Sequence, residues 1–400
     1  MADIIPDRLG REVYRVPRGR GIWSSEILSP LGLALLKEAP AATSPEQDVR
    51  KWAMAWPRVG LYDHPAFREH DSGPGHPERP QRLEAFTSGL RRERLLERLI
   101  ALPPRAATPA ELGRVHTAQH VASVAATEGR TVRFDPDTQA GPHSYAAAVL
   151  AAGAVVDAVD RVVRTGEIDR ALCAVRPPGH HATAERAMGF CLFNNVAVAA
   201  AQALHHGLRR VMVVDFDVHH GNGTQDIFYS DRRVLYVSSH AFPFYPGTGA
   251  LAEVGEGEGR GFTVNLPMPQ GFGDLEYARV YRQIVQPIGR AFDPELVLVS
   301  AGFDAHRGDP LAGMDLTREG YAELTDVCLR IAAGSAKGRV VAALEGGYDL
   351  NAIAGAAAAV AKGLLGDAHR LLVWPAHSRI DPLVDAYRAM LVPYWPILAA

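Results

Sequence analysis

The chain has 400 residues, of which 47% are hydrophobic and 22% charged, and its formal net charge is −3. These values are typical of a folded globular protein. They exclude a mostly disordered chain, and they provide no basic surface of the kind that direct nucleic-acid binding requires. The three cysteines are widely spaced, which argues against a disulfide framework or a thiolate zinc site. Neither a signal peptide nor a membrane-spanning apolar run is found, so we expect a soluble, cytoplasmic protein without a membrane partner.

The length allows two domains or one large α/β domain, and the lack of an internal repeat or long linker favours one. We predict an N-terminal extension over residues 1–55, a main domain over 56–370, and a C-terminal segment over 371–400 packed on that domain. The extension mixes basic, proline and small apolar residues. We expect it to pack on the domain surface or on a partner subunit, which would support a homo-oligomer.

Short apolar runs along the chain predict buried strands. The runs are continuous rather than alternating, as in strands covered on both faces of a parallel sheet, and they span residues 171–175, 211–216, 234–238, 296–300 and 340–344. Segments rich in alanine and leucine predict helices over residues 145–163, 195–206, 275–292, 318–333 and 351–365. Alternation of strands and helices predicts an α/β fold with helices on both faces of a parallel sheet.

Each predicted strand leads directly into a polar turn. The turns carry carboxylates, imidazoles and a phenol, and they span residues 176–181, 217–223, 239–245, 301–306 and 345–348. In an open parallel sheet, ligands bind outside the carboxyl ends of the strands. We therefore expect these side chains to gather at one edge of the sheet.

Asp217 and His219 are two residues apart at a strand end, and Asp304 follows another strand. Two carboxylates and one imidazole with a position left open describe a catalytic metal site rather than a structural one. Zn²⁺ suits this donor set, and Fe²⁺, Co²⁺ and Mn²⁺ also match it. The alternative is that Asp217 caps the next helix and His219 is a hydrogen-bonded core histidine.

His180 and His181 are the candidate acid–base pair, because a histidine beside a metal can take a proton from water and return it to a leaving amine. Adjacent histidines also occur by chance, as the pair at 205–206 illustrates. Asp215 and Asn222 flank the metal motif and are placed to orient buried imidazoles.

Tyr348 follows two glycines and can donate a hydrogen bond to a developing oxyanion. Its alternative is an ordinary buried ring. Phe190 and Tyr245 lie in glycine-flanked turns and are expected to wall a narrow apolar channel, although aromatic residues of this kind often serve the core.

With these residues identified, the chain resembles the histone deacetylase family, its class II branch in particular, and the related bacterial deacetylase-like and acetylpolyamine amidohydrolases. The likeness covers about residues 59–366. It rests on His76-Pro-Glu-Arg-Pro-Gln-Arg82, Val175-Arg-Pro-Pro-Gly-His-His-Ala182, Gly189-Phe-Cys-Leu-Phe-Asn194, Val214-Asp-Phe-Asp-Val-His-His-Gly-Asn-Gly-Thr224, Tyr245-Pro-Gly-Thr-Gly249, Ser300-Ala-Gly-Phe-Asp304 and Glu345-Gly-Gly-Tyr348.

The resemblance implies a single arginase/deacetylase-like α/β domain with a mostly parallel sheet of about eight strands. It implies a zinc-dependent deacetylase that hydrolyses the amide of an acetyl-lysine-type side chain or small acylated amine. Two alternatives stay open, an acetylpolyamine amidohydrolase and a non-catalytic module that binds acetylated ligands. A dimanganese ureohydrolase would need carboxylates where this chain has Gly221 and His306.

The resemblance also assigns roles to residues. The metal ligands for Zn²⁺ would be Asp217, His219 and Asp304. His181 would be the general base and then the general acid, with His180 as its electrostatic partner; Asp215 would support His180 and Asn222 would support His181. Tyr348 would be the oxyanion donor. One structural K⁺ would lie at Asp215, Asp217, His219, Ser238 and Ser239, and a second at carbonyls of Phe228, Asp231, Val234 and Phe262.

The substrate channel implied by the resemblance comprises His76, Pro77, Gly189, Phe190, Tyr245 and Leu311. A polyamine-selective member of the family carries Glu where this chain has Leu311. The aspartate that holds the substrate backbone at the rim in some members has no clear counterpart here, and Asp135 and Asp137 are the candidates.

Overall fold

The computed structural model describes residues 3–6, 12–15, 56–369, 372–373 and 375–399. Before residue 56 it describes two short antiparallel strands, β1 (Asp3–Pro6) and β2 (Glu12–Arg15). The predicted packing of the N-terminal extension, and the homo-oligomer that would follow from it, lie outside the described residues. The part of the chain that follows Ala55 forms a separate compact unit.

Eight strands form one sheet in the order β10-β9-β8-β11-β12-β7-β3-β4, and every neighbouring pair is parallel. The strands are β3 (Val59–Tyr62), β4 (Ile100–Ala101), β7 (Arg170–Cys173), β8 (Val211–Asp215), β9 (Val234–Ala241), β10 (Thr263–Met268), β11 (Leu296–Ala301) and β12 (Val340–Leu344). A separate small antiparallel pair is formed by β5 (Val132–Arg133) and β6 (Gln139–Ala140). The predicted α/β class with a mainly parallel sheet is confirmed.

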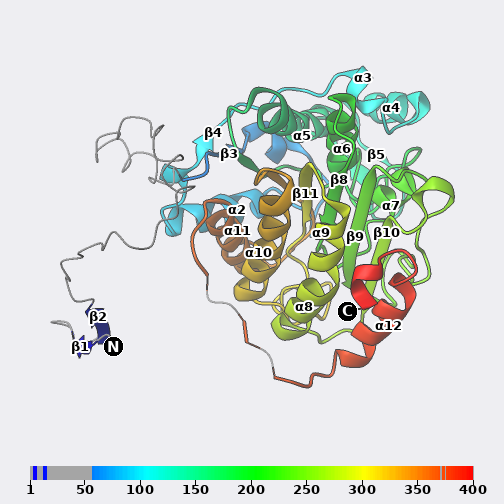
Figure 1. The fold of residues 1–400 in the computed structure, drawn as a ribbon. Coiled ribbons are helices and arrows are strands. Elements are labelled where there is room, and N and C mark those ends of the chain that lie inside the picture. The colour runs from blue at the N-terminus through cyan, green and yellow to red at the C-terminus, as the bar shows by residue number, and fades with distance from the viewer. Residues whose placement is uncertain (1–2, 7–11, 16–55, 370–371, 374, 400) are drawn as a thin grey trace, which may run out of the picture. The chain divides into compact units, whose positions relative to one another are not determined.

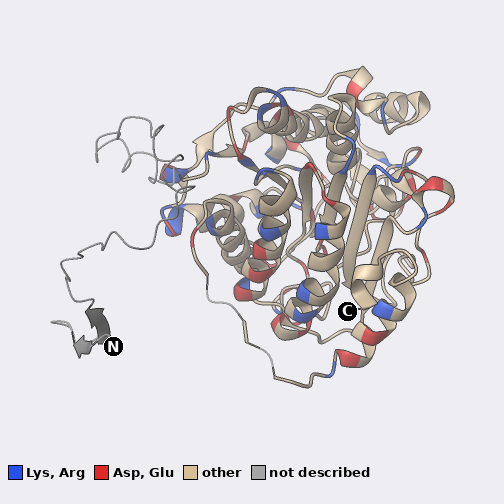
Figure 2. Cartoon of the chain, viewed as in Figure 1, with Lys and Arg blue, Asp and Glu red and all other residues tan. Residues whose placement is uncertain are grey.

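The predicted strands correspond to β7, β8, β9, β11 and β12, which occupy the middle of the sheet. Every residue of β8, β9, β11 and β12 is buried, because helices cover both faces. The strands that the apolar runs did not predict, β10, β3 and β4, lie toward the two edges. In Figure 2 the central strands carry almost no charged residues, whereas the surrounding helices and loops carry many.

The helices form two layers (Figure 1): α2 and α8 to α11 pack with one another on one side of the sheet, and α5 packs with α6 on the other. Their bounds are α2 (Gln81–Arg92), α5 (Ser144–Val159), α6 (Asn195–His205), α8 (Asp274–Val280), α9 (Gln286–Phe292), α10 (Arg318–Ser335) and α11 (Leu350–Leu364). Shorter helices are α3 (Pro109–Leu112), α4 (Ala118–Ala125) and α7 (Asn222–Phe228). This layering leaves the carboxyl edge of the sheet to the connecting turns.

The predicted helix over 275–292 is divided. A π-helical turn, η6 (Tyr281–Val285), separates α8 from α9, and Pro287 stands at the start of α9. Proline has no N–H to continue the α-helical ladder, which accounts for the irregularity at this point. The predicted helix over 145–163 likewise ends in a π-helical turn, η4 (Asp160–Thr165), after α5.

The described C-terminal residues contact the β10 edge of the sheet. Helix α12 (Asp381–Leu391) places Tyr387 so that its hydroxyl donates to the carbonyl of Pro267 in β10 at 2.8 Å. The Trp395 indole N–H donates to the carbonyl of Gly261 at 2.9 Å, and its ring meets Phe262 edge-on. These contacts cover an edge strand that would otherwise expose unpaired backbone groups. None of the described helices is long and apolar enough to cross a membrane.

Candidate active site

Three buried side chains converge at the carboxyl edge of the neighbouring strands β8 and β11. His219 Nδ1 lies 3.2 Å from Asp217 Oδ1 and 3.1 Å from Asp304 Oδ2. Backbone N–H groups hold the carboxylates in place, since Gly346 N donates to Asp217 at 2.7 Å and Val218 N donates to Asp304 at 2.9 Å. The ligand atoms of the three residues all lie within 4.8 Å of one another. The structure therefore brings together the three residues that were predicted as metal ligands from their positions at strand ends.

The electrostatics of this group favour a cation. Burial raises the pKa of Asp304 to about 7, and the charge of Asp217 adds to the effect. Burial alone would lower the pKa of His219, but Asp217 and Asp304 raise it to about 10. The protein alone thus holds a proton between two carboxylates, at the place where a divalent cation would bind. Two carboxylate oxygens and an imidazole nitrogen fit Zn²⁺ and also Fe²⁺ or Co²⁺.

Two glycines allow this close approach of carboxylates and backbone. A Cβ atom at Gly346 would collide with carboxylate oxygens of both Asp304 and Asp217, and one at Gly302 would collide with Asp217. Sequence reasoning quoted both glycines within motifs but assigned them no part in the metal site. The signal was available, because a glycine beside a ligand often marks a close backbone approach.

A second group of carboxylates and a histidine is formed by Glu323, Asp326 and His369. The Glu323 carboxylate already accepts a hydrogen bond from the guanidinium of Arg282 at 2.5 Å, and Asp326 accepts one from Arg330 at 2.5 Å. Because cations of the chain itself satisfy these carboxylates, this group suits a metal less well than the first.

The two adjacent histidines are held by different partners. His180 Nδ1 lies 3.0 Å from Asp215 Oδ2, and His181 Nδ1 lies 2.8 Å from Asn222 Oδ1. The Asn222 amide nitrogen donates to Met188 Sδ at 3.5 Å, so its oxygen faces His181 as an acceptor. An acceptor at Nδ1 fixes the proton there and leaves Nε2 of His181 as a free base.

The electrostatic environments of the two histidines also differ. Burial alone would lower the pKa of His180, but Asp215 and Asp217 raise it to about 10. Burial lowers the pKa of His181 well below its ordinary value, and the neighbouring His180 and His219 lower it further. At neutral pH, His180 therefore carries a positive charge and His181 is neutral. A neutral imidazole beside a cationic one is suited to accept a proton from water.

Tyr348 lies at the end of the turn that follows β12, and it is buried, with 7% of its surface exposed. Its backbone N–H donates to Asp309 Oδ2 at 2.6 Å, and the guanidinium of Arg82 lies 5.1 Å from the centre of its ring. Burial and the charge of Asp304 raise the pKa of the phenol well above 10. The hydroxyl therefore keeps its proton and can act as a donor. The sequence analysis quoted Arg82 within a motif but gave neither Arg82 nor Asp309 a role.

A cavity of about 100 Å³ opens onto these groups, lined by Asp137, His181, Gly189, Phe190, His219, Tyr245, Leu311 and Tyr348. Phe190 has a left-handed backbone (φ 69°), which is unfavourable for a bulky residue and typical of functional sites. Its ring meets Tyr348 edge-on at 5.9 Å. Phe190, Tyr245, Gly189 and Leu311 thus lie where the sequence analysis expected a channel.

Two residues expected in the channel lie elsewhere. His76 is not among the residues that line the cavity; its ring meets Phe190 edge-on at 4.5 Å and so supports the wall from behind. Pro77 does not line the cavity either. Of the two candidates for the rim, Asp137 lines the cavity, whereas Asp135 lines a neighbouring groove.

The residues expected around K⁺ lie in two places. Ser238 pairs with Asp215 in register across β9 and β8, next to Ser239. At the second location, the carbonyls of Phe228 and Asp231 accept hydrogen bonds from backbone N–H groups within one turn, and the carbonyl of Phe262 accepts one from Tyr236. These residues therefore flank Val234 at the start of β9. Potassium binding at either place stays a prediction.

Comparison with known proteins gives consistent matches. The profile of the histone deacetylase domain matches residues 76–364. Histone deacetylase 15 of Arabidopsis thaliana is 42% identical over 334 residues, which cover 81% of this chain and 59% of that protein. The human polyamine deacetylase HDAC10 is 43% identical over 340 residues, covering 80% of this chain and 50% of that protein.

A probable deacetylase of Archaeoglobus fulgidus is 39% identical over 296 residues, which cover 73% of this chain and 82% of that protein. The crystal structure of the HDA15 HD domain matches with a TM-score of 0.80 and 40% identity, covering 86% of this chain and 97% of that one. The chain thus spans about half the length of the plant and human relatives and most of the archaeal one.

Proposed function

The chain belongs to the histone deacetylase family, and we propose that it is a metal-dependent deacetylase that hydrolyses the amide of an acetylated amine. The proposal rests on one observation: Asp217 and Asp304 gather around His219, which lines one cavity together with His181 and Tyr348. Members of the family are generally metal-dependent. We propose Zn²⁺ as the metal, with Fe²⁺ and Co²⁺ as the alternatives that the donor set allows.

Asp217, His219 and Asp304 would hold a divalent cation, which would lower the pKa of a water molecule and polarise the acyl carbonyl. His181, neutral and free at Nε2, accepts a proton from water as water attacks the carbonyl carbon. It then returns the proton to the departing amine. The positive charge of His180 stabilises the negative charge that develops beside it. Tyr348 donates its hydroxyl proton in a hydrogen bond to the carbonyl oxygen as negative charge develops there.

The cavity supports an acetyl-lysine-type side chain or a small apolar acylated amine as the substrate. Leu311 lines the cavity and offers no charge, and the cavity walls Phe190 and Tyr245 are aromatic. One relative is named a polyamine deacetylase, so an acetylated polyamine is the second candidate. Among the described residues that line the cavity, Asp137 is the carboxylate able to meet an amine or amide N–H. A module that binds acetylated ligands without hydrolysing them would not require the His181 and Tyr348 arrangement.

The test combines metal content with hydrolysis. The purified protein, loaded with Zn²⁺, is assayed on an acetyl-lysine peptide and on acetylspermidine, and bound metal is measured by elemental analysis. Asp217→Ala, His219→Ala and Asp304→Ala should each lose bound metal and activity, and chelation should abolish activity reversibly. Asp326→Ala is the matched control, because Asp326 belongs to the other carboxylate group. A metal-free protein that keeps full activity would refute the proposal.

A further inference from the structure

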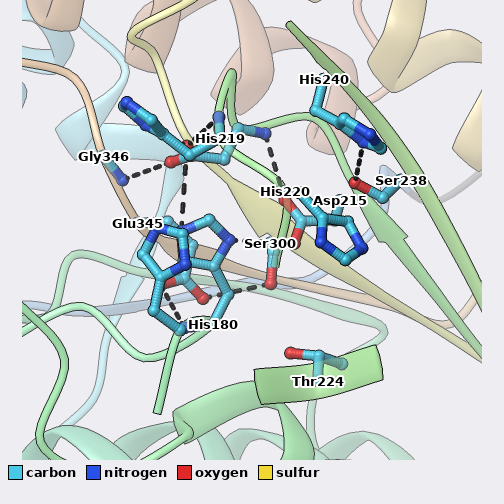
Figure 3. A network of polar contacts seen from close by, with 12 residues as sticks. His180, Asp215, His219, His220, Thr224, Ser238, His240, Ser300, Glu345 and Gly346 are labelled. Atoms are coloured by element: carbon cyan, nitrogen blue, oxygen red, sulfur yellow. Dashed lines mark hydrogen bonds and ion pairs between the residues drawn. The ribbon is translucent and has the colours of Figure 1, made fainter. Parts of the chain in front are cut away.

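Glu345 follows β12 and stands three residues before Tyr348, and its side chain is completely buried. It does not line the cavity. Its carboxylate turns toward a different part of the chain: Oε2 accepts hydrogen bonds from the backbone N–H of Gly179 at 2.6 Å and of His180 at 3.1 Å. Its second oxygen accepts a hydrogen bond from the Ser300 hydroxyl at 3.1 Å (Figure 3).

One side chain therefore joins two turns that are far apart in the sequence. The turn after β12 carries Tyr348, and the turn that Glu345 binds carries His180 and His181. The backbone of the first turn is itself held, since Arg82 donates to the carbonyl of Gly347 at 2.6 Å and to the carbonyl of Glu345. Arg82 thus holds the backbone from which the Glu345 carboxylate reaches the second turn.

We propose that Glu345 is a positioning residue that holds the His180–His181 turn at a fixed distance and angle from Tyr348. The inference rests on the proposed roles of His181 and Tyr348, which act on the same carbonyl from these two turns. A displacement of about 1 Å between reacting groups can reduce a rate by about 100-fold. A link between the turns therefore acts on catalysis without touching the substrate.

A purely structural explanation accounts less well for a carboxylate here. Burial raises the pKa of Glu345 to about 7, partly offset by the charge of His180, so the site disfavours the ionised form that accepts all three hydrogen bonds. Buried ionisable groups with shifted pKa values often lie at functional sites. The two N–H groups of Gly179 and His180 point to the reason, because no side chain other than that of Glu345 is recorded as accepting from them among the described residues.

The experiment compares Glu345→Ala, Glu345→Gln and Glu345→Asp in the metal-loaded protein. Ala removes all three acceptors, and we expect kcat to fall by about 100-fold with KM changed less than about threefold. Gln keeps an oxygen for the two N–H groups, and its amide can donate to Ser300, whose hydroxyl also accepts. We therefore expect Gln to restore kcat to within about tenfold of the wild type. Asp keeps the charge but is one methylene shorter, so we expect kcat at least tenfold below the wild type.

Hydrogen exchange of the Gly179 and His180 amides gives a readout independent of activity: we expect faster exchange in Ala and near-wild-type exchange in Gln. Glu323→Gln is the matched control, because Glu323 is equally buried and lies on α10 outside the site. It should leave kcat unchanged. If Glu345→Ala does not fold, Glu345→Asp replaces it.

A wild-type kcat in Ala or Asp would overturn the proposal, as would a Gln variant as slow as Ala or an effect on KM alone. Failure of the proposed function has a different result. His181→Ala and Tyr348→Phe would then retain activity, whatever exchange shows at Gly179 and His180.

Discussion

Replacing Tyr348 by Phe removes one oxygen atom from the site and leaves the ring in place. The Phe ring can keep the edge contact with Phe190 and the position under the Arg82 guanidinium, 5.1 Å from the ring centre. Among the described residues, the structure records no hydrogen bond to the hydroxyl, so the substitution breaks no such contact in the protein. We therefore expect the free energy of unfolding to change by less than about 1 kcal/mol, the net value of one ordinary hydrogen bond.

The effect on the reaction should be much larger. Removal of one oxyanion-hole donor costs about 10²- to 10³-fold in kcat, or about 2.7–4 kcal/mol. The pKa of the phenol lies well above 10 because of burial and the charge of Asp304, so Tyr348 is a neutral donor throughout the neutral pH range. Because negative charge develops on the carbonyl oxygen only as the reaction proceeds, KM should change little.

The assay is steady-state hydrolysis of an acetyl-lysine peptide by equal amounts of folded, metal-loaded wild type and Tyr348→Phe. Asp309→Ala extends the test, because Asp309 accepts the N–H groups of Tyr348 at 2.6 Å and Asp349 at 3.1 Å. If Asp309 acts through the phenol, Asp309→Ala lowers kcat in the wild type and has little further effect in Tyr348→Phe. An unchanged kcat with a raised KM in Tyr348→Phe would refute the role as oxyanion donor and assign Tyr348 to substrate binding.

Three further predictions follow from particular contacts. Gly346→Ala should displace the carboxylates of Asp217 and Asp304 and lower the amount of bound metal measured by elemental analysis. Gly334→Ala is the control, because a Cβ atom there meets nothing within 4 Å. Unchanged metal content in Gly346→Ala would contradict the predicted collision. Leu311→Glu should raise the ratio of kcat/KM for acetylspermidine to kcat/KM for the acetyl-lysine peptide by about tenfold, because a unit charge pair at about 4 Å gains about 1 kcal/mol in water and about 4 kcal/mol at an effective dielectric of 20. This gain should become smaller as salt is added, and an unchanged ratio would exclude Leu311 as a selectivity residue. Burial and the nearby His120 lower the pKa of His116 to about 3. Below pH 6.5 the unfolded chain therefore binds a proton that the folded chain excludes, and the free energy of unfolding should decrease as the pH is lowered, by about 3 kcal/mol for this group down to pH 4. His116→Gln should reduce this decrease in urea unfolding, and an equal decrease in both proteins would refute the assignment.

Much of the site could be predicted because its residues stand at strand ends. Asp217 and Asp304 are 87 residues apart in the numbering, yet they meet because β8 and β11 are neighbours in the sheet. The sequence does not reveal that strand order. It did not need to, since every parallel strand delivers its carboxyl end to the same edge.

The elements that were missed lack a local signal. Strand β4 has only two residues, and β3 and β10 contain Gly60 and Pro267, which weaken the apolar pattern of a buried strand. The break at Pro287 was visible in the sequence but was overridden by the apolar periodicity around it. Strands β3 and β10 are nevertheless almost fully buried, because neighbouring strands and helices cover them, whereas both residues of β4 are exposed.

The functional residues that were missed are of a different kind, since they bind backbone rather than substrate. Glu345 stands within the motif that carries Tyr348, but its partners, Gly179 and His180, lie about 165 residues earlier. Asp309 likewise binds the N–H of Tyr348 across 39 residues. Residue type and spacing indicate which side chains can react, whereas contacts of this range depend on how the turns pack.

The buried charged residues beneath the site also bind backbone groups that are distant in the sequence. Glu78 accepts hydrogen bonds from two buried guanidinium groups, those of Arg82 at 2.8 Å and Arg176 at 2.5 Å. Buried ion pairs of this kind seldom stabilise a fold more than apolar residues would. Each arginine, however, also donates to carbonyls of the backbone: Arg82 to the turn that carries Tyr348, and Arg176 to the carbonyl of Phe67 at 3.0 Å. These charged side chains thus fix backbone positions that apolar packing alone would leave free to shift. The backbone positions in turn determine where the reactive side chains lie.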